Sequence, residues 1–344
     1  MKKIYYIVVV FAILFLAGCG DGIDLPGVNV ETDLNKIPLP DNNVNLEQVE
    51  LKPSTEPMLH EGLHTEEDFQ RIRDKKAAGE EPWVSAYQLL VESQFSQKTA
   101  DTYPTEWIKR GVSGDENYMN AARGATIAYQ QALRWKIEQD DEYAAKAVEN
   151  LNKWVQTCVG VTGNTNLSLA AGLYGYEFAI AGELLRDYGG WDRADFAAFQ
   201  NWLLKVFYPA NDDFLKRHHD TNALHYWANW CLCNIAAKMA IGIVTDRRDI
   251  YNEGIDHLQT GDTNGRLRRA IYHDYAPDYN FAQWQESGRD QGHTLMCVGL
   301  MGVICQLAWS QGDDFFAYDD NLFLRACEYA ACCNYTNETV PNTT

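Results

Sequence analysis

Basic residues are scarce in this chain of 344 residues, which has 29 Lys and Arg against 48 Asp and Glu and a formal net charge of −19. So acidic a protein is not expected to bind nucleic acid or a negatively charged membrane surface. An anionic ligand is not excluded, because its binding depends on local charge. The places where the few basic residues gather are therefore the most informative.

Metal-ligand patterns are also lacking. Cys231-x-Cys233 and Cys332-Cys333 do not have the two-residue gap of a zinc knuckle, and no matching pair of histidines follows them. Most cysteines lie in apolar helical runs, where a free cysteine packs as a small hydrophobic residue. We expect neither a metal nor a cofactor, and one disulfide with unassigned partners is compatible with export.

The body of the chain has no run of alternating β-branched residues and no 34-residue repeat. Three predicted helices, 167–187, 222–244 and 289–310, are apolar on most faces, whereas 141–157 and 192–206 have one apolar stripe and one charged face. Helices that are apolar all round are buried, and amphipathic helices lie outside. This alternation predicts an all-α fold, an (α/α) barrel or toroid of paired inner and outer helices, formed by residues 57–344 as one domain.

The N-terminus resembles a bacterial lipoprotein signal. Lys2 and Lys3 precede fourteen apolar residues, fewer than the roughly 20 that a membrane-spanning helix needs. The run ends in Leu16-Ala17-Gly18-Cys19, a pattern cut before the cysteine. We therefore predict a signal peptide at 1–18, lipid attachment at Cys19, a flexible tether at 19–56, and export to the cell envelope, on the periplasmic side or the outer surface. The alternative is a short N-terminal anchor with a chance cysteine.

Polar side chains interrupt the predicted inner helices in three places. In the first, Asn222, His225 and Asn229 fall on one helical face, and His218 joins them if the helix starts early. Such a stripe inside a barrel is costly unless it meets water or a ligand. A satisfied polar network in the core is the structural alternative.

The second place has three arginines in four residues, Arg266, Arg268 and Arg269, followed by Tyr272 and Tyr275. It is either an anion-binding loop or a solvated helix end. In the third place Gln285, Arg289 and His293 are spaced by four, so they share a face if the inner helix begins before them. Arg289 is expected either to pair with Glu286 or Asp290, or to bind a carboxylate.

Several motifs resemble the alginate lyase-domain proteins of Bacteroidota. They are Pro57-Met58-Leu59-His60, the run 64–69, Glu81-Pro82-Trp83, Arg134-Trp135-Lys136, the run 171–176 and, most specifically, the block 285–293. The resemblance covers residues 57–344. Because relatives usually continue further, it implies a toroid that is incomplete at its C-terminal side.

The resemblance also implies site residues. Asn222 and His225 precede a Tyr-Trp pair, as in those lyases, although His218 or His219 could replace His225. The run 269–275 is similar to a segment leading to a catalytic tyrosine, with one residue deleted, so Tyr275 and Tyr272 both remain candidates. The implied substrate-binding residues are Arg289, His293, Arg269, Gln285, Trp227, His218 and His219.

The implied reaction is β-elimination on an acidic uronic polysaccharide. The enzyme neutralises the uronate carboxylate, and either His225 as neutral imidazole or a tyrosinate removes the C5 proton. A tyrosine hydroxyl protonates the leaving oxygen. Two alternatives come from other classes. One is an inverting glycosidase that uses carboxyls among Glu286, Asp290, Asp274 and Asp278, and the other is a non-catalytic glycan-binding lipoprotein. Oligomeric state is left open.

Overall fold

The computed structural model describes residues 54–335 and 340–342. The predicted signal peptide, Cys19 and most of the predicted tether lie outside these residues. The lipoprotein hypothesis is therefore still a prediction from the sequence.

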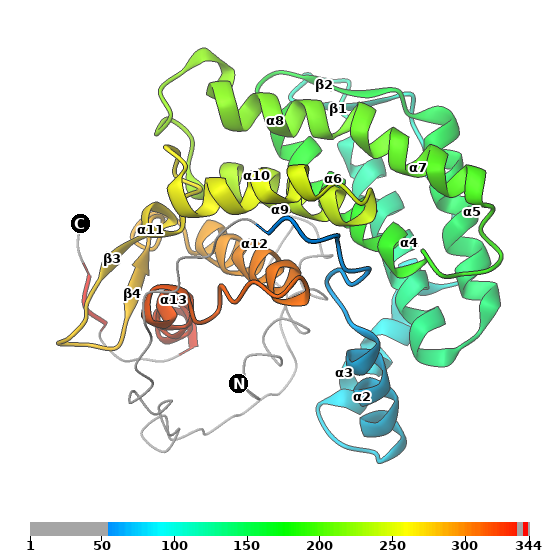
Figure 1. Ribbon diagram of the computed structural model, residues 1–344, viewed down its shortest axis with the longest axis horizontal. Helices are drawn as coiled ribbons and strands as arrows, with labels where there is room; N and C mark the ends of the chain where they lie inside the picture. Colours follow the sequence, from blue (N-terminus) through cyan, green and yellow to red (C-terminus); the bar gives the residue numbers. More distant parts are fainter. Residues whose placement is uncertain (1–53, 336–339, 343–344) are drawn as a thin grey trace.

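Four helices form the inner layer, and each packs against the next in chain order: α4 packs on α6, α6 on α9, and α9 on α12. Their bounds are Tyr118–Glu138, Leu167–Leu184, Ala228–Val244 and Gln291–Ser310. The outer helices are α5 (Asp141–Thr157), α7 (Arg193–Val206), α8 (Tyr208–Arg217), α10 (Arg248–Thr260) and α13 (Tyr318–Tyr335). Figure 1 shows this layered arrangement, with α2 (Glu66–Ala77) and α3 (Trp83–Glu92) beside it. The predicted all-α architecture and the predicted inner helices are confirmed.

The inner helices are apolar because they are covered on almost every side. In α9, every residue from Cys231 to Val244 is buried, including Lys238. The lysine is tolerated because its ammonium group lies 2.8 Å from Asp212 and also contacts Glu253. Helix α12 is long and apolar enough to cross a membrane, but 67% of its apolar window is buried inside the protein. It is therefore a core helix of the toroid.

A close contact between α6 and α9 requires glycine at position 172. A Cβ atom there would lie 2.9 Å from the carbonyl carbon of Cys233 and 3.0 Å from the backbone nitrogen of Asn234. Since backbone atoms cannot rotate away, Gly172→Ala should lower the free energy of unfolding by roughly 1–3 kcal/mol. Thermal unfolding of this variant is compared with that of Gly189→Ala, because Gly189 has nothing within 4 Å. Equal melting temperatures for the two variants would contradict this helix contact.

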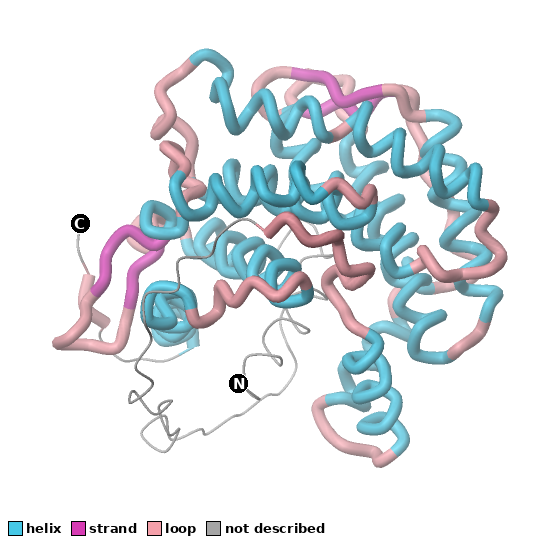
Figure 2. The backbone as a smooth tube through the Cα atoms, in the orientation of Figure 1, coloured by secondary structure: helices cyan, strands magenta, loops and turns pink. Residues whose placement is uncertain are grey.

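Short strands occur in two places where none was predicted. Strands β1 (Trp107–Arg110) and β2 (Gly160–Gly163) pair in parallel, and β3 (Ile271–Asp274) and β4 (Ala282–Trp284) form an antiparallel hairpin. Figure 2 shows one pair at the top and the other at the left edge of the helical body. Both are too short to give a periodic sequence signal, so a helix-only prediction missed them.

The predicted helix 222–244 begins too early. In the structure α9 starts at Ala228, and residues 221–227 form a loop. The preceding helix α8 ends because His218, His219 and Asp220 all adopt positive φ angles. Asn222, His225 and Asn229 therefore do not share a helical face, and that prediction is wrong.

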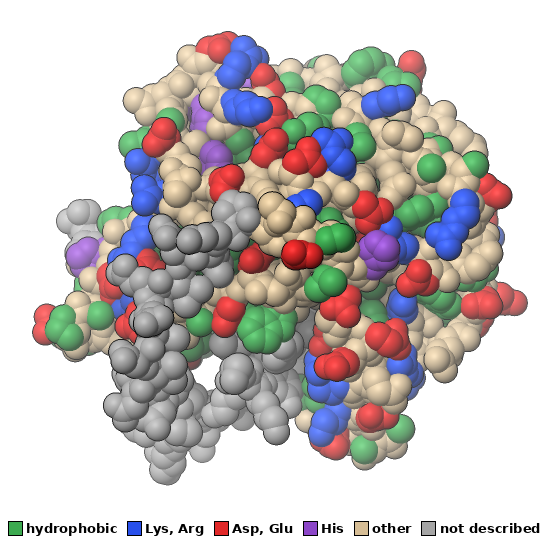
Figure 3. Space-filling model, in the orientation of Figure 1, with side chains coloured by type: hydrophobic (Ala, Val, Ile, Leu, Met, Phe, Trp, Pro, Cys, Tyr) green, Lys and Arg blue, Asp and Glu red, His purple; other side chains and the backbone are tan. Residues whose placement is uncertain are grey.

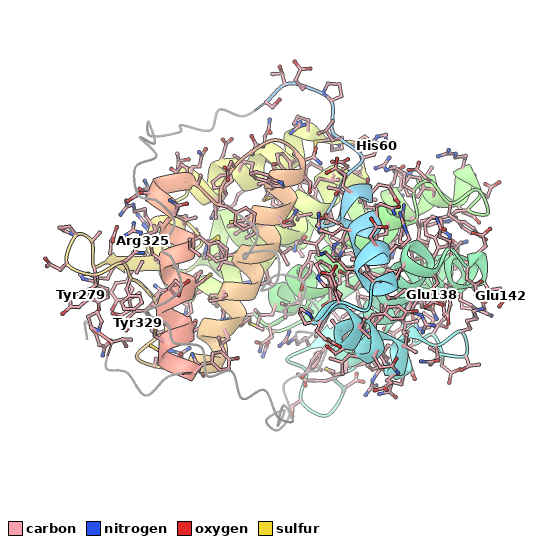
Figure 4. The ribbon with its side chains drawn as sticks, turned by 90° about the horizontal axis from the view of Figure 1, so that it is seen from below. His60, Glu138, Glu142, Tyr279, Arg325 and Tyr329 are labelled. Atoms are coloured by element: carbon pink, nitrogen blue, oxygen red, sulfur yellow. The ribbon has the colours of Figure 1, made fainter. Side chains whose placement is uncertain are left out.

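The segment before α2 crosses the C-terminal ends of the inner helices (blue in Figure 1). The Gln311 amide, just after α12, donates to the carbonyl oxygens of Leu59 and Glu61. The His60 Nε2 atom lies 3.0 Å from Asp246, which follows α9; Figure 4 labels His60. His64 Nε2 lies 2.5 Å from the Tyr129 hydroxyl of α4. This segment, 54–65, is therefore held against the end of the toroid opposite the helix N-termini.

Candidate active site

The N-terminal ends of α9 and α12 meet at a loop and a turn that carry most of the predicted site residues. The side-chain oxygen of Gln285 accepts the backbone N–H of Ala228, at 3.0 Å, and so caps the start of α9. The Asn264 amide donates to the carbonyl oxygens of Leu224 and Tyr226. These bonds hold the loop 221–227 over the turn that precedes α12.

The central side chain of this region is Arg289, which contacts both Trp227 and Glu286. The Arg289 guanidinium lies 4.6 Å from the centre of the Trp227 ring and donates to the Glu286 carboxylate. The Glu286 side chain has no exposed surface, whereas that of Arg289 is 46% exposed. The Asn229 amide also donates to Glu286, at 3.3 Å. A buried carboxylate thus holds an exposed cation on an aromatic ring, which fits recognition of an anionic sugar.

Asp290 and His293 complete the turn. Asp290 caps α12, because its Oδ1 atom accepts the backbone N–H of His293 at 3.0 Å. Its Oδ2 atom lies 2.7 Å from the His293 Nδ1 atom. The helix therefore begins at Gln291, and the prediction that Gln285, Arg289 and His293 share one helical face is wrong. The structure nevertheless brings all three to the same region.

His218 and His219 lie beneath the loop and pack against the ring of Tyr226. His218 Nε2 is 3.6 Å from the Cys231 sulfur, and His219 Nε2 is 3.0 Å from the Ser168 hydroxyl of α6. Burial lowers the pKa of His218 below its ordinary value, so this imidazole is held neutral. The two histidines support the loop from below.

Asn222 and His225 are exposed on the loop itself. The Asn222 Oδ1 atom accepts the backbone N–H of Leu224 at 2.8 Å, which shapes the turn. The His225 ring meets the Tyr226 ring edge-on, 4.9 Å between centres. Within the described residues, no hydrogen bond orients the His225 imidazole.

The two candidate tyrosines lie on the β3–β4 hairpin. Tyr275 donates its hydroxyl hydrogen to Gln283 Oε1 at 2.5 Å and stacks on Tyr329 of α13, whereas Tyr272 is 43% exposed. Arg325 of α13 binds both carboxylate oxygens of Asp274 and so holds the hairpin in place. Figure 4 shows Tyr329 and Arg325 on the side of α13 toward the hairpin. The hairpin base joins the turn, because Gln285 N–H donates to Ala270 O at 2.9 Å.

The arginines before the hairpin are largely engaged within the protein. Arg268 pairs with Asp319 and lies 3.7 Å from Asp274, and Arg269 donates to the carbonyl oxygen of Asp262. Figure 3 shows basic side chains along the left edge of the molecule, over α11 (Leu267–Ala270). Three of the four carboxylates named for a glycosidase are also engaged, since Glu286 pairs with Arg289, Asp274 with Arg325 and Asp290 with His293.

Arg110 is a candidate that sequence reasoning missed. Its guanidinium lies 4.6 Å from the ring centre of Tyr118, which stacks on Tyr174 of α6. Its Nη1 atom is buried without a hydrogen-bond partner, and within residues 54–335 and 340–342 no carboxylate pairs with it. The only sequence signal is Lys109-Arg110, two adjacent cations in an acidic chain. Because β1 runs beside the start of α6, Arg110 lies at the same end of the toroid as Arg289.

In the part of the chain that the structure describes, no group of three or more His, Cys, Asp or Glu side chains could hold a metal ion. Of the eight cysteines between 158 and 333, six are buried. Burial raises the pKa of the Cys231 thiol to about 11, consistent with a packing role.

Comparison with solved structures finds alginate lyases of similar fold. The structure is similar to alginate lyase A1-III from Sphingomonas species A1, with 13% identity, 80% of each chain covered and a TM-score of 0.56. A variant of alginate lyase A1-III complexed with tetrasaccharide gives 14% identity, 80% of each chain and 0.57. An alginate lyase from Bacteroides ovatus gives 14%, 78% of this chain, 82% of that chain and 0.58. No curated protein sequence matches.

The fold of these structures is the (α/α) toroid predicted from the sequence. A family model described as alginate lyase matches residues 72–338, most of the chain. The predicted activity, that of a polysaccharide lyase, is thereby confirmed. The chain belongs to the alginate lyase family.

Proposed function

We propose that the protein cleaves alginate or a related uronic polysaccharide by β-elimination, at the N-terminal ends of α9 and α12. The observation that supports this site best is Arg289, half exposed and held on the Trp227 ring by the buried Glu286 carboxylate. Within the described residues, the Nε and Nη1 groups of Arg289 have no hydrogen-bond partner. Either group can donate a charge-assisted hydrogen bond to a substrate carboxylate.

The elimination reaction requires a cation or hydrogen-bond donors beside the uronate carboxylate. The hydrogen on C5 is acidified only when the adjacent carboxylate is neutralised, because removal of the proton spreads negative charge onto the carboxylate oxygens. Arg289 is assigned this role, with the Asn222 amide, whose Nδ2 group is not used within the described residues, as a second donor. Arg110 and the Tyr118 ring, at the same end of the toroid, suit a neighbouring sugar unit of the polymer.

The leaving oxygen on C4 must receive a proton as its bond to C4 breaks. A tyrosine of the hairpin is assigned to donate it, Tyr275 first and Tyr272 as the alternative. His225 or a tyrosinate would accept the C5 proton, as in the reaction inferred from the resemblance. The products are a new reducing-end chain or sugar and a C4=C5 unsaturated uronate.

We further propose that the protein is exported and attached to the cell envelope by lipid at Cys19. The sequence of residues 1–19 supports this assignment. The segment 54–65 lies at the end of the toroid opposite the candidate site. A tether joined there would leave the site open to a polymer.

Incubation with alginate, polymannuronate, polyguluronate and glucuronan tests the function. Ultraviolet absorbance should rise, because elimination creates a double bond conjugated with the carboxylate. New reducing ends without that absorbance would mean hydrolysis, and polymer binding without either change would mean a binding protein. Each of those two results would contradict the proposal.

A further inference from the structure

Asp290 and His293 form a pair in which one carboxylate holds both the backbone and the ring of the same residue. Asp290 Oδ1 accepts the His293 backbone N–H at 3.0 Å, and Oδ2 lies 2.7 Å from the ring Nδ1 atom. The first of these bonds is the main reason why the pKa of Asp290 lies below its ordinary value. Asp290 is therefore ionised and accepts the proton on Nδ1.

This hydrogen bond decides which nitrogen of His293 can act as a base. A neutral imidazole carries one proton, and a carboxylate at Nδ1 keeps it there. Nε2 then has a free lone pair. The His293 side chain is 45% exposed, and within the described residues Nε2 has no hydrogen-bond partner. His293 thus presents a basic nitrogen at the site in a fixed orientation.

The side chains of His293 and Arg289 both lie beside the Glu286 carboxylate. The Nδ1 atom is 4.0 Å from Glu286 Oε2, the oxygen to which Arg289 donates. In a uronate, the proton to be removed is on C5 and the carboxylate is attached to C5. The base and the cation must therefore lie close together, and these two side chains satisfy that requirement.

Three other histidines at this end of the toroid are less suitable. The His225 ring has only an edge contact with Tyr226. His218 and His219 are engaged by Cys231 and Ser168 beneath the loop. Within the described residues, no carboxylate is hydrogen-bonded to any of these three rings.

We propose that His293, oriented by Asp290, is the base that removes the C5 proton, in place of His225. The inference rests on the proposed function. Nε2 takes the proton from C5, and the electron pair of the C5–H bond forms the C4=C5 double bond. The C4–O bond breaks, its electron pair goes to the leaving oxygen, and the tyrosine hydroxyl protonates that oxygen. His293 then gives its proton to water, and the tyrosinate takes a proton from water, which restores both groups.

The variants His293→Ala and His293→Gln test the assignment on whichever polymer the parent cleaves. We expect kcat to fall by about 10²–10⁴-fold, with little change in KM, because a proton-transfer group is lost. Added imidazole should restore part of the kcat of His293→Ala. Asp290→Asn should lower kcat less, since asparagine still caps the helix but does not fix the tautomer.

His60→Ala is the matched control. His60 is another exposed histidine paired with an aspartate, at 3.0 Å from Asp246, but at the opposite end of the toroid. It should behave like the parent, and all variants should keep the parent melting temperature. Undiminished kcat in both His293 variants, or loss and imidazole rescue in His225→Ala instead, would overturn the inference while leaving the lyase function intact. A parent that forms no unsaturated product would overturn the proposed function itself.

Discussion

Tyr275→Phe is expected to lower kcat on uronic polysaccharides by about 10²–10⁴-fold, because it removes one proton-transfer group. The change deletes a single oxygen from a side chain that stacks on Tyr329. The stack remains, so folding and polymer binding should be nearly unchanged. Initial rates of unsaturated-product formation, with KM from the same assays, measure the effect.

Tyr272→Phe is the necessary comparison, since the deletion in the run 269–275 leaves both tyrosines as candidates. The two differ in surroundings: the Tyr275 hydroxyl donates to Gln283, whereas Tyr272 is exposed on the hairpin. If only Tyr272→Phe is inactive, the lyase mechanism stands and the acid is Tyr272. If both variants keep near-parental activity on every substrate, the tyrosine mechanism is wrong.

Replacing Arg289 by Ala should raise KM and lower kcat. A hydrogen bond to a charged group contributes about 1.5–3 kcal/mol, which corresponds to roughly a 10- to 150-fold loss in kcat/KM. Part of that loss is expected in kcat, because the cation binds the carboxylate more strongly as charge develops on it. The same assays on polymer with methyl-esterified carboxylates should give a much smaller difference between the parent and Arg289→Ala.

A complication is that Arg289→Ala leaves Glu286 buried without its cation, which destabilises the turn. Two further variants separate binding from stability. Arg289→Lys keeps the charge but loses the planar guanidinium, which can donate to Glu286 and to a substrate at the same time. Arg289→Ala combined with Glu286→Gln removes the orphaned charge. The double variant should regain the parent melting temperature without regaining activity. If it regained full activity, Arg289 would not be the carboxylate-binding residue.

The sequence alone was sufficient to predict the layered helical fold. Inner and outer helices differ in which faces are apolar, and that pattern has a period of 3.6 residues, so it can be read within one helix. Helices α6 (Leu167–Leu184) and α12 (Gln291–Ser310) have nearly the bounds predicted from the apolar pattern, 167–187 and 289–310. The motif block 285–293, which contains Arg289 and His293, was the most specific of the motifs that indicated the family.

The start of α9 could not be predicted in this way. The apolar pattern extends back to residue 222, but the loop before Ala228 is held by Gln285 and Asn264, which are 57 and about 40 residues away along the chain. A helix end is decided by which groups satisfy its free N–H donors. Here the backbone N–H of Ala228 is satisfied by Gln285, a partner distant in sequence. Asn222 and His225 therefore lie in the loop before α9 and not in the helix, where the sequence pattern had placed them.

The same reason applies to the chemistry of the site. The sequence shows where the arginines and histidines are, but it does not show which of them already form ion pairs or hydrogen bonds within the protein. Arg268 lies against Asp319 and Arg269 against the Asp262 carbonyl. Arg110 lies over the Tyr118 ring, and within the described residues no carboxylate pairs with it. Which cation is free for a substrate, and which histidine has its tautomer fixed by a carboxylate, depends on distances between side chains from separate elements, and only the tertiary structure brings those elements together.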